Sequence, residues 1–382
     1  MSVPPQGNWP PPQQPGNPAS SGQPYGPPGN QPGYTASPPG WQQGPWQQPP
    51  GPPPQKGNGL KWLLIAVAIL LVIGISVGAT LIFTRGDGGG GSSPTSGAAS
   101  DIASANDTGP VSIITDEPTC NAFVGINNSL ADIQANGWGD IRSNLGPIAG
   151  WTPDQRAQVE AVAEATRKAA EQVVPLAKQT PHRLVRELYE QFIAYGRAYA
   201  DSIPSYVPSD DGFASANVNA SSAVIGICNT IQYGSASRSI GVQPVDAPPE
   251  AAAIGDLGNP ARFFDAPHDE CSEWTSRLDA FNAATADWQK RDGSIPATDW
   301  TPEQRALTDA ALPLLTRFAD DSEQAALRSP NPVFRDFALA TTLYSRAFVS
   351  ASSDYVNADG WLNFTAFRFA NLIAGACKAV GG

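Results

Sequence analysis

The sequence predicts an all-α protein in which two tandem, disulfide-closed four-helix bundles follow one transmembrane helix and a disordered proline-rich tail. Three observations lead to this fold class. They are an uncharged apolar run, a duplicated segment with helical periodicity, and four cysteines that all lie in the duplicated part. Helical periodicity and apolar run length are the primary sequence signals for such elements.

The tail, residues 1–61, is rich in Pro, Gly and Gln and contains no acidic residue. Proline fixes φ and removes a backbone donor, and this composition buries too little apolar surface to fold, so we expect disorder. Aromatic residues such as Trp9, Tyr25 and Trp41 punctuate the tail. Two interpretations stay open, a docking strip for a cytoplasmic protein partner and a solubilising spacer.

Residues 62–83 carry no charge, and a bilayer core requires about 20 apolar residues in a helix. A cleaved signal peptide fits less well, because the run starts only after 61 residues. The run is also longer than the apolar region of a signal peptide, which has about 7–15 residues. We therefore expect a signal-anchor helix. Gly74 and Gly78 form a GxxxG pair, which predicts a dimer face and hence a homodimer, although glycine is common in membrane helices.

The cysteines predict the orientation of this span. All four follow it, as expected if that side is an oxidising compartment. Lys56 and Lys61 before the span favour a cytoplasmic N-terminus. The sequence thus predicts a single-pass cell-membrane protein with an extracytoplasmic C-terminal domain, joined to the span by a Gly/Ser-rich linker at 84–117.

The C-terminal domain contains an internal duplication. The segment that starts at Trp151 recurs at Trp300, an offset of 149 residues that holds as far as Cys228 and Cys377. Other residues in the same register match as well: Pro181 with Pro330, Arg186 with Arg335, Tyr195 with Tyr344, and Tyr206 with Tyr355. We assign repeat 1 to residues 118–229, an interdomain linker to 230–269, and repeat 2 to 270–382.

Each repeat is predicted to contain four helices. The segment Thr-Pro-Asp/Glu-Gln at Thr152 and Thr301 is a helix start, with a threonine cap, proline in the first turn and glutamine completing a capping box. Apolar side chains then recur at helical spacing, and a last helix ends at the final cysteine. The linker at 230–269 is either disordered or docked on a bundle.

In an up-down-up-down bundle, the start of the first helix and the end of the fourth lie at the same end. The sequence therefore predicts the disulfides Cys120–Cys228 and Cys271–Cys377. The rival pairing, Cys228–Cys271, would staple the linker instead. The cysteines form no CxxC pair, so we expect no zinc site and no other metal.

The formal net charge of −12 argues against nucleic acid, whose affinity rests on Lys and Arg. The sequence contains no nucleophile elbow, P-loop or dinucleotide fingerprint. We therefore expect no catalytic residue, no cofactor and no enzyme activity. The repeats share one feature that fits a binding site, Tyr195 and Arg197 in repeat 1 and Tyr344 and Arg346 in repeat 2, although tyrosine on an apolar stripe is more often core.

The proline-rich tail, the span, the Gly/Ser linker and the Ala-rich acidic domain together resemble the proline-rich single-pass envelope proteins of mycobacteria and related actinobacteria. This resemblance implies a cell-envelope setting. From these features we expect a binding or adaptor protein whose duplicated domain engages an envelope protein, lipid or wall component. The alternative is a carrier that encloses lipid or another small ligand in its bundles.

Overall fold

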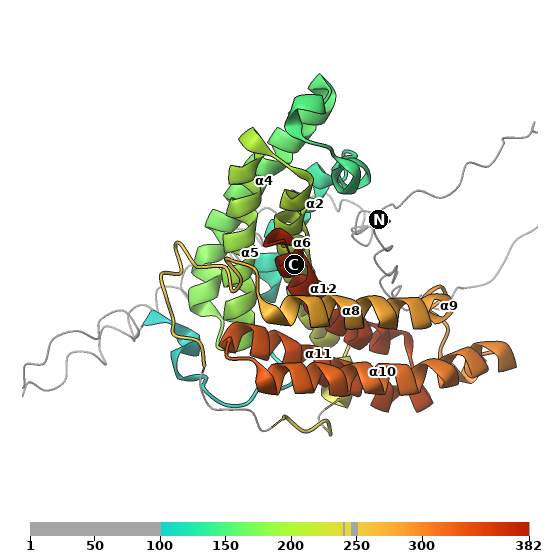
Figure 1. Ribbon diagram of the computed structural model, residues 1–382. Helices are drawn as coiled ribbons and strands as arrows, with labels where there is room; N and C mark the ends of the chain where they lie inside the picture. Colours follow the sequence, from blue (N-terminus) through green and yellow to red (C-terminus); the bar gives the residue numbers. More distant parts are fainter. Residues whose placement is uncertain (1–100, 240, 246–250, 382) are drawn as a thin grey trace, which may run out of the picture. The chain divides into compact units, whose positions relative to one another are not determined.

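The computed structural model describes residues 101–239, 241–245 and 251–381, and within them the protein is all-helical, as predicted. Each repeat contributes four long helices (Figure 1). In repeat 1 these are α2 (Cys120–Gln134), α4 (Pro153–Gln179), α5 (Arg183–Ser202) and α6 (Asp211–Gln232). In repeat 2 they are α8 (Asp269–Ala284), α10 (Pro302–Arg328), α11 (Pro332–Ala351) and α12 (Gly360–Ala379).

Shorter elements lie between the long helices or, at residues 103–106, ahead of the first one. Three are single α-helical turns: α3 (Trp138–Ile141), α7 (Ser235–Arg238) and α9 (Ala286–Gln289). The others are 3-10 turns at 103–106, 142–144, 148–150, 203–205, 208–210, 297–299, 352–354 and 357–359.

The predicted helix starts are confirmed. The Thr152 and Thr301 side chains each accept a hydrogen bond from the glutamine three residues on, and that glutamine side chain accepts one from the threonine backbone. Each cap is worth about 1 kcal/mol of helix stability. Both caps begin helices of 27 residues, α4 and α10, which pack along α5 and α11 respectively (Figure 1).

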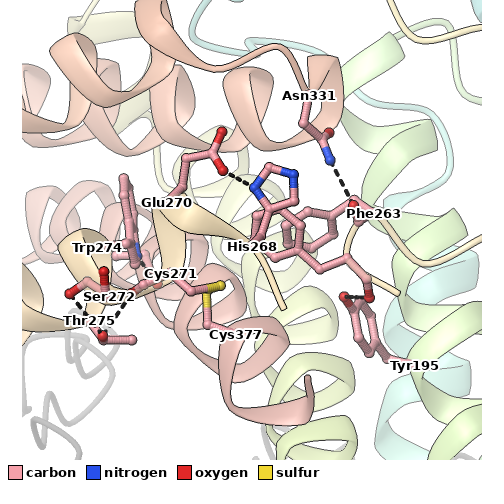
Figure 2. Close-up of a disulfide and its surroundings, with 12 residues drawn as sticks. Tyr195, Phe263, His268, Glu270, Cys271, Ser272, Trp274, Thr275, Asn331 and Cys377 are labelled. Atoms are coloured by element: carbon pink, nitrogen blue, oxygen red, sulfur yellow. Dashed lines mark hydrogen bonds and ion pairs between the residues drawn. A yellow bond between two sulfur atoms is a disulfide. The ribbon is translucent and has the colours of Figure 1, made fainter. Parts of the chain in front are cut away.

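Two disulfides join the first helix of each repeat to its last. They are Cys120–Cys228, between α2 and α6, and Cys271–Cys377, between α8 and α12, shown in Figure 2. These are the two bonds that the register of the duplication predicts. Each closes a loop of more than 100 residues, with sequence separations of 108 and 106.

The two tandem repeats share one core, and how they pack together is a point that the sequence left open. One apolar core includes buried residues of both repeats, and α6 packs more extensively on α12 than on any helix of its own repeat. The physical reason lies in α6, which carries no charged residue after Asp211. A helix without a charged face is stable only when it is covered on all sides.

Helices α6 and α12 cross as an antiparallel, pseudo-twofold pair. Gly226 lies against Thr365, and its repeat equivalent Gly375 lies against Ala216, which is the equivalent of Thr365. The missing side chains let the two backbones approach closely.

Arg368 of α12 donates from Nη1 to Oδ1 of Asn219 over 3.3 Å. Asn219 occupies the equivalent position in α6. Residues at equivalent positions contact each other only near the axis that relates the two repeats.

Reciprocal ion pairs join the ends of this central pair. Nζ of Lys378, at the end of α12, lies 2.7 Å from the carboxylate of Asp211 at the start of α6. Nη1 of Arg238, just beyond α6, lies 2.9 Å from the carboxylate of Asp359 at the start of α12. The acidic start of each of these two helices is therefore neutralised by a basic side chain at, or just beyond, the end of the other helix.

No helix in residues 101–239, 241–245 or 251–381 is long and apolar enough to cross a membrane. The predicted single-pass, signal-anchored topology is corrected on this finding, since no helix among the described residues supports it. The tail at 1–61, the expected span at 62–83 and its dimer face at Gly74 and Gly78 lie outside the described residues.

Candidate functional site: the paired tips

The tyrosines that were candidate ligand contacts lie in the core. Tyr195 and Tyr344 are both fully buried, and burial raises the pKa of each above its usual value. The Tyr195 hydroxyl donates to the carbonyl of Phe264 over 3.3 Å, and the Tyr344 hydroxyl accepts from the backbone N–H of Ile114 over 3.4 Å. Both rings therefore support packing.

The two arginines of the same candidate set hold neighbouring segments. Nη1 of Arg197 donates to the carbonyl of Gly258 in the linker. Nη2 of Arg346 lies 2.6 Å from Asp320 and 2.5 Å from Glu323, both on α10. Because each arginine has a partner of its own and the tyrosines are buried, the structure does not bring the four residues together as a ligand site.

The later part of the linker docks on the helices, which settles the alternative that the sequence left open. Phe263 and Phe264 lie in the core, and Asn331, the N-cap residue of α11, donates to the Phe263 carbonyl over 2.7 Å (Figure 2). The ring of His268 stacks on Phe264, with centroids 4.8 Å apart, and contacts Glu270. In the part of the chain that the structure describes, no group of His, Cys, Asp or Glu side chains could hold a metal ion.

A feature that the repeats share at the surface lies where the chain enters α4 and α10. We define tip 1 as residues 146–151 with Tyr206 and Val207, and tip 2 as residues 295–300 with Tyr355 and Val356. In both tips a tryptophan packs on the tyrosine ring, with centroids 5.0 Å apart for Trp151 and 5.7 Å for Trp300. The two tips occupy equivalent positions of the duplication.

Hydrogen bonds brace each tip in the same way. The Trp151 and Trp300 indoles donate to the carbonyls of Gly146 and Ile295, over 2.7 and 2.8 Å. The Tyr206 and Tyr355 carbonyls accept from the backbone N–H groups of residues 148 and 297, over 3.1 and 2.9 Å. Each loop is thereby fixed to the segment that follows α5 or α11.

The residue after each tyrosine is an exposed valine. Val207 and Val356 are 44% and 39% exposed, while their backbone N–H groups donate to Asp210 and Asp359 over 2.9 Å. Single exposed apolar residues are ordinary at protein surfaces. Here, however, the described residues expose only four large apolar side chains, and two of these, Val207 and Val356, occupy equivalent positions of the duplication. The other two are Ile133 and Leu327.

The surroundings of the two tips differ. An open hollow adjoins tip 1, lined by residues 144–147, 149–151 and Gln155. Exposed carboxylates surround tip 2, at Asp292, Asp299 and Glu303; of these, only Glu303 has an acidic equivalent beside tip 1, the exposed Asp154. Hydrogen bonds from Ser294 lower the pKa of Asp292, and hydrogen bonds from the Glu303 backbone and Thr301 lower the pKa of Glu303, so both stay ionised at neutral pH.

One signal in the sequence points to the tips. Val207 and Val356 directly follow the matched Tyr206 and Tyr355 in the same register. Their exposure could not be read from the sequence, because valine is among the residue types most often buried. Chemically, each tip can provide a rigid apolar contact, and tip 2 provides it within an acidic rim.

Comparison with known proteins gives the family. A protein of Mycolicibacterium smegmatis (strain MKD8), described as uncharacterised, is 43% identical over 343 residues, which cover 88% of this chain and 90% of that protein. No solved structure matches the chain. The sequence profile of a family described as Mycobacterial ESX-1 associated protein matches residues 102–381. The expected mycobacterial setting agrees with these findings, whereas the proline-rich tail lies outside the matched region. The chain belongs to the family of mycobacterial ESX-1 associated proteins.

Proposed function

We propose that this protein is a non-enzymatic binding component associated with the ESX-1 secretion system, and that its two tips contact a protein of that system. The family assignment supports the association with ESX-1. The pair of equivalent, braced and exposed valines supports the choice of surface. This pair is the observation that carries the proposal.

The chemistry of the tips suggests what the partner surface provides. Val207 and Val356 offer apolar contact on a backbone that is already held in place, so little conformational entropy is lost when a partner binds. The carboxylates around tip 2, Asp292, Asp299 and Glu303, favour a partner with basic side chains around its own apolar patch. Two tips on one chain allow two-point attachment, which raises the apparent affinity over that of either tip.

Serine substitutions test this proposal, because serine removes the apolar contact without adding charge. We expect Val207→Ser and Val356→Ser each to reduce the amount of ESX-1-encoded protein that co-purifies with the full chain, and the double variant to abolish it. The matched control is Leu327→Ser, since Leu327 is similarly exposed, at 37%, but lies outside both tips. Undiminished co-purification by a folded double variant would refute the assignment.

The alternative function, a carrier of lipid or another small ligand, has no specific observation in its favour. Aromatic side chains meet in the middle of repeat 2, where Phe281 packs on Phe318 and Phe367 with ring centroids 4.7 and 5.3 Å apart. Native mass spectrometry of the purified chain distinguishes the two functions, because a carrier would retain lipid.

A further inference from the structure

The segment ahead of the first helix, residues 101–119, lies across both repeats, and we call it the strap. Its buried residues include Val111, Ile114 and Glu117. Glu117 accepts a hydrogen bond from Thr180 of repeat 1 over 2.6 Å, while the backbone of Ile114 donates to Tyr344 of repeat 2. The strap therefore contacts helices of both copies.

Arg183, the first residue of α5, is where the strap and the two repeats meet. Its backbone N–H donates to Oδ2 of Asp107 over 2.7 Å, and Nη1 donates to the Asp107 carbonyl over 2.8 Å. Its Nε donates to Oδ2 of Asp336 on α11 over 2.7 Å and lies 3.9 Å from Glu187. One buried guanidinium thus joins the strap, repeat 1 and repeat 2.

The two carboxylates at this junction occupy equivalent positions in the duplication, Glu187 in α5 and Asp336 in α11. Both are buried, and neither oxygen of Glu187 has a hydrogen-bond partner. The position equivalent to Arg183 is Pro332, so the second repeat offers no such arginine to the pair.

A buried ion pair adds little to stability compared with apolar packing, yet losing one partner is strongly unfavourable. Any change that moves the Arg183 guanidinium away from these carboxylates should therefore destabilise the contact between α5 and α11.

We propose that the strap is a latch: Asp107 holds Arg183 on the Glu187–Asp336 pair, and withdrawal of Asp107 loosens the seam between α5 and α11. The central α6–α12 pair stays closed, because it is held by its own ion pairs and glycine contacts. The strap continues directly into residues 1–100. A partner that binds those residues can therefore act on the seam through the chain.

Hydrogen–deuterium exchange on the full chain tests the latch with Asp107→Ala. This variant removes the carboxylate that accepts from the Arg183 backbone N–H at the start of α5, while the backbone carbonyl that accepts from Nη1 remains. Loss of this hydrogen bond to a charged acceptor should raise exchange about tenfold in peptides that cover residues 186–195 of α5 and 335–344 of α11. Peptides from α6 and α12 should be unchanged. Asp116→Ala is the matched control, since Asp116 lies on the same strap with an exposed side chain and only its backbone carbonyl contacts His182.

If Asp107→Ala fails to fold, Asp107→Asn preserves the shape and removes the charge, and it should raise exchange in the same peptides to a smaller extent. The proposal is overturned if a folded Asp107 variant changes exchange in the strap alone, or changes α5 and α11 no more than Asp116→Ala does. In that case the strap is a passive cover.

Discussion

Close backbone contact between α6 and α12 predicts that alanine at Gly375 destabilises the protein, although alanine favours helices. A Cβ atom at Gly375 would lie 2.7 Å from the backbone nitrogen of Ala216 and 3.0 Å from the backbone carbon of Ser215. Both atoms belong to the opposite helix, so neither can move without shifting that helix.

The magnitude follows from two opposing effects. Overpacking of this kind costs about 1–3 kcal/mol, while replacing glycine by alanine inside a helix gains about 1 kcal/mol. We expect Gly375→Ala to lose up to about 2 kcal/mol net, because its Cβ meets backbone atoms that cannot move freely. Gly125→Ala is the control, because Gly125 lies in α2 with no atom within 4 Å of an added Cβ, so only the gain applies.

Urea unfolding with both disulfides intact measures the stability difference between each variant and the wild type. A change in the transition midpoint reports it when the dependence of the unfolding free energy on urea concentration is the same in both proteins. Gly375→Ala should lower the midpoint and Gly125→Ala should raise it. If both variants raised it by similar amounts, the two backbones would not be in contact. The repeats would then be separate bundles after all.

Three further predictions concern stability. Replacing Cys120 and Cys228 by serine should lower the free energy of unfolding by up to about 4.7 kcal/mol in the chain-entropy model, and an unchanged urea midpoint would argue against a structural bond. Thr301→Ala should cost about 1 kcal/mol through loss of its cap, with Thr316→Ala on the exposed face of the same helix as the control. Burial, and then Asp336, raise the pKa of Glu187 well above its usual value. The stability that Glu187 contributes is therefore complete below its unfolded pKa and is lost as pH rises through its folded pKa. The free energy of unfolding of Glu187→Gln should thus rise relative to that of the wild type as pH increases. A difference between the two proteins that stays constant with pH would contradict this.

Features governed by neighbouring residues could be predicted from the sequence. The helix starts at Thr152 and Thr301 follow from side-chain hydrogen bonds within one turn. The disulfides followed from the duplication, because its register places the first and last helix of a repeat at one end.

The merger of the repeats was missed although α6, with no charge between Gly212 and Gln232, signalled a helix buried on all sides. The sequence left open whether Tyr195 and Tyr344 are ligand contacts or core for a related reason. Whether a residue of an apolar stripe faces a ligand or a neighbouring helix depends on how the repeats pack, and local periodicity does not encode that. The exposure of Val207 and Val356 is likewise a tertiary property.

Site-specific photo-crosslinking in cells tests the central claim about the tips most directly. A photoreactive amino acid replaces Val207 or Val356, and Leu327 serves as the exposed apolar control position. We predict crosslinks to the same ESX-1-encoded protein from both tip positions and none from position 327. Crosslinks from position 327 at equal yield, or none to ESX-1 proteins from either tip, would contradict the account.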